Sequence, residues 1–104
     1  MSRIPFESTD GPTKYGNWYG FRVGSCEGLW RATEDTYEIL SVINSKKGNG
    51  HFQETMWWFE QSCRRDGKKL VIREIWNMRL LCGLRRHGFH RMRGHLLTYE
   101  KVFA

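Results

Sequence analysis

A short loop with two glycines carries the residues of this chain that are best suited to bind a phosphate group. Asn44–Gly50 (NSKKGNG) places Gly48 and Gly50 two positions apart, with Lys46 and Lys47 directly before them. Glycine lets a backbone turn sharply and approach a ligand closely. The start of a helix presents unpaired N–H groups with partial positive charge. If a helix begins after Gly50, the segment predicts a site for phosphate or pyrophosphate.

From its own residues, the loop is open to two interpretations. Paired glycines often serve only to turn the chain, and lysines on a loop are often simply solvated. The segment does not end in the Gly-Lys-Ser/Thr of a P-loop, and it lacks the third glycine of a dinucleotide-binding fingerprint. The loop residues alone therefore do not distinguish a phosphate site from a plain turn, and the predicted elements on either side are needed to choose between them.

The residues after the loop have the spacing of an amphipathic helix. Phe52, Met56, Phe59 and Cys63 recur at intervals of four, three and four. This spacing places them on one helical face, where they can pack against a core. Gly67 is suited to end the helix, because glycine adopts the left-handed conformation of a helix C-terminus.

Strands are expected on both sides of this helix. The predicted strands are 15–23, 29–33 and 36–43 before it, with turns at 24–28 and 34–35, and 70–76, 89–93 and 96–102 after it. Within 36–43, alternation places Tyr37, Ile39, Ser41 and Ile43 on one face and Glu38, Leu40 and Val42 on the other. A second helix is predicted over 78–87, with Leu80, Leu81 and Leu84 inward and Gly88 at its end.

This order of elements predicts an α+β fold. Strand, helix and strand in the middle indicate a crossover between parallel neighbours, whereas the flanking strands favour antiparallel pairing. We expect a mixed, mostly antiparallel sheet of about six strands with two main helices packed on it. Residues 1–14, which contain both prolines, are expected to form an irregular N-terminal arm, and residues 15–104 a single domain.

The same order, from about Leu29 to Phe89, resembles the acetyl-CoA-binding half of the GNAT superfamily of N-acetyltransferases. The family's loop motif, [RQ]-x-x-G-x-[GA], binds the pyrophosphate of coenzyme A and corresponds here to Ser45–Gly50. The family's next strand ends near an Asn, here Asn77. Its following helix runs into a Gly-Phe pair, here Gly88 and Phe89. The resemblance implies a GNAT-like fold with acetyl-CoA as co-substrate and an amine, on a protein or a small molecule, as acceptor.

The resemblance also implies a role for individual residues. The candidate cofactor-binding residues are Lys46, Lys47, Gly48, Asn49 and Gly50 for the pyrophosphate, Val42 and Ile43 for the pantetheine arm through their backbone, and Asn77 on the neighbouring strand. Direct acetyl transfer needs a base and donors for a developing oxyanion. Glu38 is the candidate catalytic base, with Glu74 as a weaker candidate; either can also be an ordinary strand residue.

Several residues depart from the family pattern. Ser45 stands where the loop motif has Arg or Gln, and the loop is shorter than usual. Leu84 occupies the position of a Tyr that many members use as general acid. Residues 1–28 have almost no counterpart of the family's first strand and first two helices. These departures favour an alternative function, a catalytically inactive GNAT-like scaffold with a structural or host-interaction role, for example in a phage.

The charge balance points to anionic partners. The chain of 104 residues has a formal net charge of +6, which suits a phosphorylated cofactor, an acidic protein or nucleic acid but also serves solubility. An Arg-rich segment, comprising Arg85, Arg86, Arg91 and Arg93, leaves a basic nucleic-acid-binding module as a further alternative. His87, His90 and His95 lie in the same segment, but no Cys or carboxylate completes a set with metal-ligand spacing, so no metal is expected.

The cysteines and apolar segments bear on location and partners. Cys26, Cys63 and Cys82 are odd in number and lack zinc-binding spacing. The chain has no apolar run of membrane-spanning length and no apolar segment typical of a signal peptide. We expect reduced thiols, no membrane partner and a cytoplasmic protein, or one of the host cytoplasm or virion if viral. Trp57 and Trp58 favour packing over base stacking. Other aromatics, including Trp18, Tyr19 and Trp30, suggest a homodimer or protein assembly.

Overall fold

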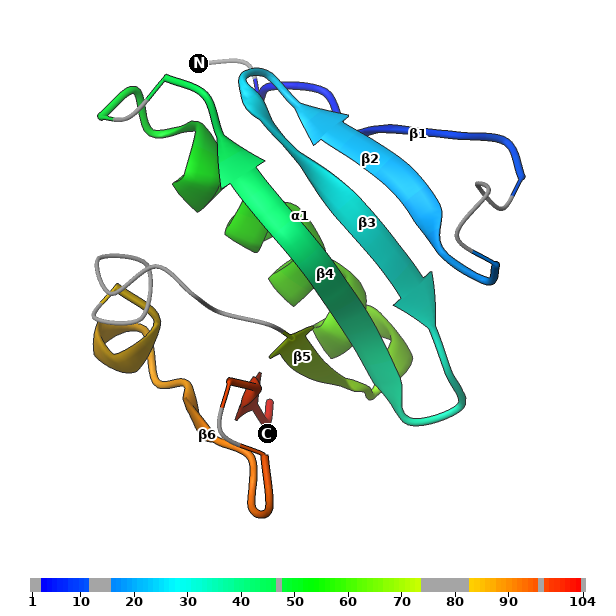
Figure 1. Cartoon of the computed structure of the whole chain (residues 1–104), viewed down its shortest axis with the longest axis vertical. Helices are drawn as coiled ribbons and strands as arrows, with labels where there is room; N and C mark the ends of the chain where they lie inside the picture. Colours follow the sequence, from blue (N-terminus) through cyan, green and yellow to red (C-terminus); the bar gives the residue numbers. More distant parts are fainter. Residues whose placement is uncertain (1–2, 12–15, 47, 74–82, 96, 104) are drawn as a thin grey trace.

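The computed structural model describes residues 3–11, 16–46, 48–73, 83–95 and 97–103. Within these residues, seven strands form one mixed sheet, and a long helix packs on one of its faces (Figure 1). The elements are β1 (Glu7–Ser8), β2 (Tyr19–Val23), β3 (Cys26–Ala32), β4 (Thr36–Asn44), α1 (His51–Asp66), β5 (Lys69–Arg73), β6 (His90–Arg91) and β7 (Tyr99–Lys101). Residues 83–86 form a further short helical segment.

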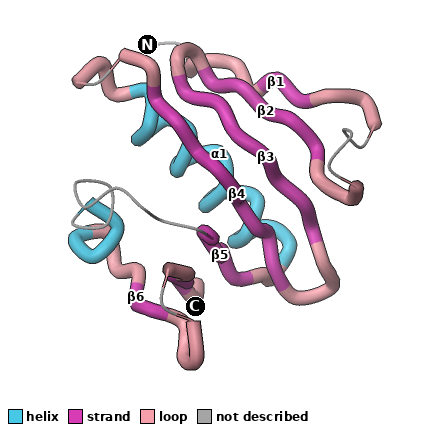
Figure 2. Tube along the Cα trace, in the orientation of Figure 1, coloured by secondary structure: helices cyan, strands magenta, loops and turns pink. Residues whose placement is uncertain are grey.

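The strand order in the sheet is β1-β2-β3-β4-β5-β7-β6. Among the described residues, only β4 and β5 pair in parallel, and all other neighbours in the sheet are antiparallel. The helix α1 connects β4 to β5 (Figure 2). The expected α+β class, the mostly antiparallel sheet and the parallel central pair are confirmed. The described part of the chain adds one strand to the six expected, because β1 pairs with β2 through Glu7 and Arg22.

The N-terminal arm is not irregular throughout, because Glu7–Ser8 form β1, which corrects the sequence-based expectation for these two residues. Ile4 and Phe6 pack against the core before the chain enters β1. The indole Nε1 of Trp58 donates a hydrogen bond to the Ile4 carbonyl at 2.7 Å, and Arg3 lies over the ring of Trp57 at 4.0 Å. The arm therefore lies along α1, and packing of the Trp57–Trp58 pair is confirmed.

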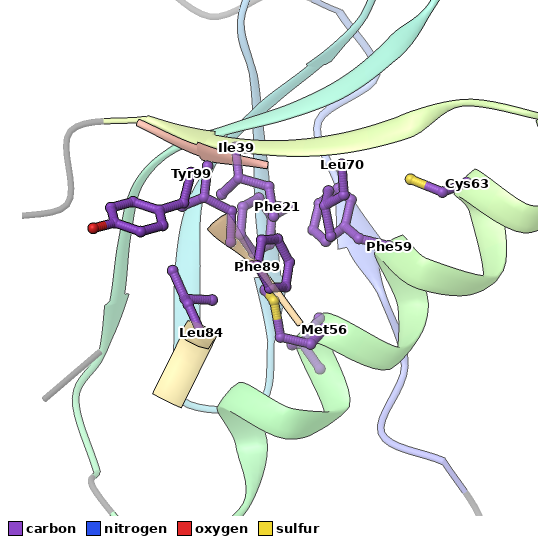
Figure 3. Close-up of a cluster of buried hydrophobic side chains, with 11 residues drawn as sticks. Phe21, Ile39, Met56, Phe59, Cys63, Leu70, Leu84, Phe89 and Tyr99 are labelled. Carbon is purple, nitrogen blue, oxygen red and sulfur yellow. The ribbon is translucent and has the colours of Figure 1, made fainter. Parts of the chain in front are cut away.

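The predicted helix is confirmed as α1, which spans 16 residues and buries the expected face. Met56, Phe59 and Cys63 point into the cluster of buried side chains between α1 and the sheet (Figure 3). Gly67 ends the helix with a positive φ of 66°, and its N–H bonds to the Cys63 carbonyl. Each fully buried Leu, Ile or Phe contributes about 1.5–3 kcal/mol, so this face holds α1 on the sheet.

The predicted turn at 24–28 is wrong in its extent. Only Gly24 and Ser25 form the turn, and β3 already starts at Cys26. Gly28 therefore lies inside a strand. The predicted strand 15–23 begins only at Tyr19 within the described residues.

The predicted alternation along β4 holds only for its first half. Tyr37 and Ile39 face α1 as neighbours of the core, but a β-bulge follows, where the register with β3 shifts. Ser41 has a positive φ of 57° at this point. Because a bulge inserts one extra residue, the side chains after it change face. Val42 therefore packs against the core, and Ile43 is 61% exposed on the opposite face.

The C-terminal segment completes the sheet beside β5. β6 and β7 pair antiparallel, and Gly94 between them has a positive φ of 82°, so the predicted hairpin is confirmed. The predicted second helix is confirmed for residues 83–86, where Leu84 is fully buried; its earlier part lies outside the described residues. No helix of the described residues is both long and apolar enough to span a membrane.

Candidate functional site

The glycine loop connects the end of β4 to the start of α1, as the sequence predicts. Gly48 and Gly50 have φ angles of 82° and 81°, a region that residues with a side chain rarely adopt. A Cβ atom added at either glycine would meet no other atom within 4 Å. The two glycines are therefore needed for the backbone conformation, and the space above them is open to a ligand.

The first turn of α1 is capped only in part. The Asn49 Oδ1 accepts a hydrogen bond from the His51 N–H at 3.0 Å, and the Glu54 N–H bonds to the Gly50 carbonyl at 3.1 Å. Gly50, at the N-cap position, has no side chain to accept from the next N–H groups. Within the described residues, the amides of Phe52 and Gln53 find no other acceptor. N–H groups at this position of a helix are the ones that can donate to an anion.

A compact polar network holds the loop against the turn between β2 and β3. The Ser25 hydroxyl donates to Asn44 Oδ1 at 2.6 Å and accepts from Asn49 Nδ2 at 2.7 Å. The backbone N–H of Ser25 donates to the Nδ1 of His51 at 2.9 Å. Ser25 comes from the β2–β3 turn and the other three residues from the stretch between the end of β4 and the start of α1, so the network fixes the loop relative to the sheet.

The position of His51 depends on a glycine below its ring. A Cβ atom at Gly24 would lie 2.3 Å from the Nδ1 of His51, and Gly24 has a positive φ of 59°. Since Nδ1 accepts from the Ser25 N–H, neutral His51 carries its proton on Nε2. His51 and Ser25 were not among the sequence-predicted site residues, because their contact joins positions 26 apart and no local spacing marks it.

The bulge in β4 interrupts its pairing with β3 next to this loop. Ser41 and Val42 have no ladder partner on β3, and the parallel pairing with β5 ends at Leu40 and Arg73 in the described part of the chain. Gly28 faces the bulge across the sheet. A Cβ atom there would lie 3.1 Å from the Cα of Val42 and 3.2 Å from the Leu40 carbonyl oxygen. The missing side chain at Gly28 thus lets the bulged backbone approach β3.

An open groove crosses the sheet face opposite α1, beside the bulge. It has a volume of about 960 Å³. Its apolar lining includes Trp18, Leu29, Leu40 and Ile43, with Ser41 at the bulge. The groove is wide and shallow, so it can accept a ligand that approaches β4 from this side.

Glu38 lies in the first half of β4, away from the loop. The side chain is 4% exposed, hydrogen-bonds to Arg73, and forms an ion pair with Arg31 at 3.3 Å. Burial by itself would raise the pKa of Glu38, but hydrogen bonds and charges from Arg73 and Arg31 outweigh it and lower the pKa. A carboxylate with a lowered pKa is a weak base. The surroundings of Glu38 therefore favour a structural role, as the centre of an ion pair that joins β3, β4 and β5, over a role as catalytic base.

The sequence-predicted site residues fall into three groups. Lys46, Gly48, Asn49 and Gly50 lie together in the loop, next to Val42 and Ile43 at the end of β4, whose side chains point to opposite faces. Glu38 lies six residues before Asn44, about 20 Å along the strand. Lys47 and Asn77, with Glu74 and Cys82, lie outside the described residues.

The histidines and arginines near the C-terminus take part in local contacts. His90 lies 3.3 Å from Glu100, and Arg85 donates to the Tyr99 hydroxyl at 3.3 Å. Among the described residues, no three His, Cys, Asp or Glu side chains gather as a metal site would require.

Comparisons of the chain with protein-family models, with curated proteins and with solved structures find no match. The assignment of a function therefore depends on the loop, the partly capped helix and the bulged strand.

Proposed function

We propose that this protein is a GNAT-like N-acetyltransferase that binds acetyl-CoA at the glycine loop and transfers the acetyl group to an amine. The observation that carries the proposal is the loop itself: two left-handed glycines lead into a helix whose Phe52 and Gln53 amides lack acceptors in the described residues. Such an arrangement suits a pyrophosphate. Lys46, which is exposed at the same loop, adds positive charge.

The second half of β4 supports a site for the rest of the cofactor. The pantetheine arm contains amide groups, which pair well with free backbone groups along a strand. The bulge at Ser41 and Val42 leaves such groups off the β3 ladder, directly before the loop. A thioester placed there would face the open groove, from which an amine can attack the carbonyl carbon and release the coenzyme A thiol.

A second function, a GNAT-like scaffold without catalysis, is favoured by two specific observations. The candidate base Glu38 is held between two arginines with a lowered pKa. Leu84, at the position of the expected general acid, is fully buried in the core. Both residues therefore contribute to stability in the folded chain, and neither offers a proton-transfer group at the loop.

Thermal unfolding with and without acetyl-CoA tests the binding step. At a hundredfold its dissociation constant, the ligand should stabilise the fold by about 2.7 kcal/mol, which corresponds to a shift on the order of 10 °C for a domain of this size. The Gly48→Ala, Gly50→Ala variant should lose the shift. Gly67→Ala is a matched control, because Gly67 also has a positive φ and open space around it but lies at the other end of α1.

Release of free thiol from acetyl-CoA in the presence of amines then separates the two functions. Ligand stabilisation together with amine-dependent thiol release supports the acetyltransferase. Stabilisation without thiol release supports the scaffold that retains the cofactor site. The absence of any shift at millimolar acetyl-CoA would rule out the site at the loop.

A further inference from the structure

A small hollow lined by aromatic rings lies between α1 and the sheet, on the side of the arm. It has a volume of about 140 Å³. We call it the aromatic hollow; its lining consists of Phe6, Trp30, Tyr37, Trp58, Phe59, Ser62 and Arg65. Ser62 lies eleven residues along α1 from His51, about 16 Å from the glycine loop. The hollow is therefore separate from the proposed acetyl-CoA site.

The rings of the hollow are held by contacts with one another. Phe6 and Phe59 meet edge to face with centroids 5.4 Å apart, and Trp30 and Tyr37 lie 6.3 Å apart. The indole of Trp58 is fixed by its hydrogen bond to the arm. Rings in this distance range attract one another through edge and face contacts. The walls are preformed, so a ligand does not have to create the space.

The size of the hollow matches one six-membered ring. A dry cavity of about 150 Å³ lined by apolar side chains is known to bind benzene. The hollow is similar in volume, and its aromatic walls offer ring faces and edges to a ring of the same size. A larger, fused ring system or a coenzyme would not fit within it.

The polar groups around the hollow select among ligands that carry a ring. The Ser62 hydroxyl donates to the Trp58 carbonyl at 3.1 Å and keeps its own lone pairs for a donor. Arg65 binds Asp66, and Lys68 lies over the ring of Tyr37 at 5.0 Å. Aromatic cages often bind cations, but two positive side chains against one carboxylate disfavour a cation here. A ring with a hydroxyl group can pack against the aromatic walls and donate a hydrogen bond to Ser62.

We propose that the aromatic hollow is a binding site for a small free phenol, a single aromatic ring whose hydroxyl donates to Ser62. This site is independent of acyl transfer and of the glycine loop. With only seven non-hydrogen atoms, phenol is expected to bind with a dissociation constant on the order of 1 mM.

Titration of the ¹⁵N-labelled protein with phenol, followed by NMR, tests the proposal. The indole N–H signals of Trp30 and Trp58 should shift in a saturable way, whereas that of Trp18, on the opposite sheet face, should not. Ser62→Leu, which fills the hollow, should weaken binding at least tenfold. Gln61→Leu introduces the same side chain at the neighbouring exposed position and should leave binding unchanged.

Two further ligands keep the test decisive even if Ser62→Leu does not fold. Cyclohexanol has a similar size but no aromatic ring, so it should bind at least threefold more weakly than phenol. N-acetyltyrosinamide should also bind more weakly, because its backbone extends beyond the hollow. The proposal is overturned by the absence of saturation up to 20 mM phenol, by equal titration of the two leucine variants, or by tighter binding of either comparison ligand.

Discussion

The two halves of β4 differ in pairing, burial and charge. The first half, Thr36–Leu40, pairs with β5 along its whole length and with β3 from Tyr37 onward, and Ile39 is fully buried. In the described part of the chain the second half, 41–44, pairs only with β3, carries the bulge and exposes Ile43. One strand thus combines a half that is paired on both sides with a half that, in the described part of the chain, is paired on one side only.

The side chains that surround each half follow the same division. Glu38 ties the first half to Arg31 on β3 and Arg73 on β5. The second half ends in Asn44, which belongs to the network with Ser25. A catalytic or binding role therefore fits the second half better, although the only carboxylate on β4 lies in the first.

The largest effect is expected at Glu38. Glu38→Gln removes the charge between two guanidinium groups and should destabilise the fold by about 2–3 kcal/mol; loss of one partner of a buried pair costs about 3–5 kcal/mol, reduced here because the arginines are partly exposed. Urea unfolding at pH 7 measures the loss in free energy of unfolding, with Glu34→Gln at an exposed position as the control. A loss no larger than that of the control would contradict the structural role.

The interaction of Glu38 with its two arginines should also make the stability of the fold depend on pH. Because the folded-state pKa of Glu38 lies below its ordinary value of 4.5, its stabilising contribution is complete above that value. It should disappear as the pH falls through the folded-state pKa. The difference in free energy of unfolding between wild type and Glu38→Gln should therefore shrink in acid. A difference that stays constant below pH 4.5 would show that the carboxylate is not the source.

The next largest effect is expected opposite the bulge. Gly28→Ala places a methyl group against the backbone of Val42 and Leu40, where relief requires the strands to move apart. The expected cost is about 1–3 kcal/mol, measured by urea unfolding. Gly11→Ala, at an open and exposed glycine, should change stability little. If the bulged backbone binds the cofactor, as proposed, Gly28→Ala should also weaken stabilisation by acetyl-CoA; unaltered ligand stabilisation would argue against that role.

A smaller and more local effect is expected at the loop network. His51→Ala removes the acceptor for the Ser25 N–H and should cost about 1–2 kcal/mol. Amide hydrogen exchange should accelerate at Ser25 and at the loop, while Ile39 in the first half of β4 keeps its protection relative to global unfolding. Uniform acceleration along β4 would mean that the two halves open together.

The smallest effect concerns two buried thiols, Cys26 on β3 beside the end of β4 and Cys63 on α1. The pKa of Cys63 is raised to about 12, mainly by burial and to a smaller extent by nearby carboxylates. Burial also raises the pKa of Cys26. Both should resist alkylation at pH 8 in the native protein, followed by peptide mass spectrometry. Cys26, which pairs with Asn44 next to the loop, should react before Cys63. If Cys63 reacted before Cys26, the structure around the second half of β4 would not be the part that opens more easily.

Short-range patterns were sufficient for much of this fold. The spacing of Phe52, Met56 and Phe59 predicted α1, and Gly67 predicted its end, because helix packing and capping depend on residues a few positions apart. The position of the glycine loop between β4 and α1, with Gly48 and Gly50 in it, also followed from local sequence.

The tertiary structure decided the features that join distant residues. The contact of Glu38 with Arg73 spans 35 positions and that of Ser25 with His51 spans 26. The bulge depends on the absence of a side chain at Gly28 on the neighbouring strand. Periodicity cannot report such contacts, because it describes the surroundings of a residue only along its own segment. The chemical surroundings of Glu38 and of the glycine loop therefore emerged only once the strands were brought together.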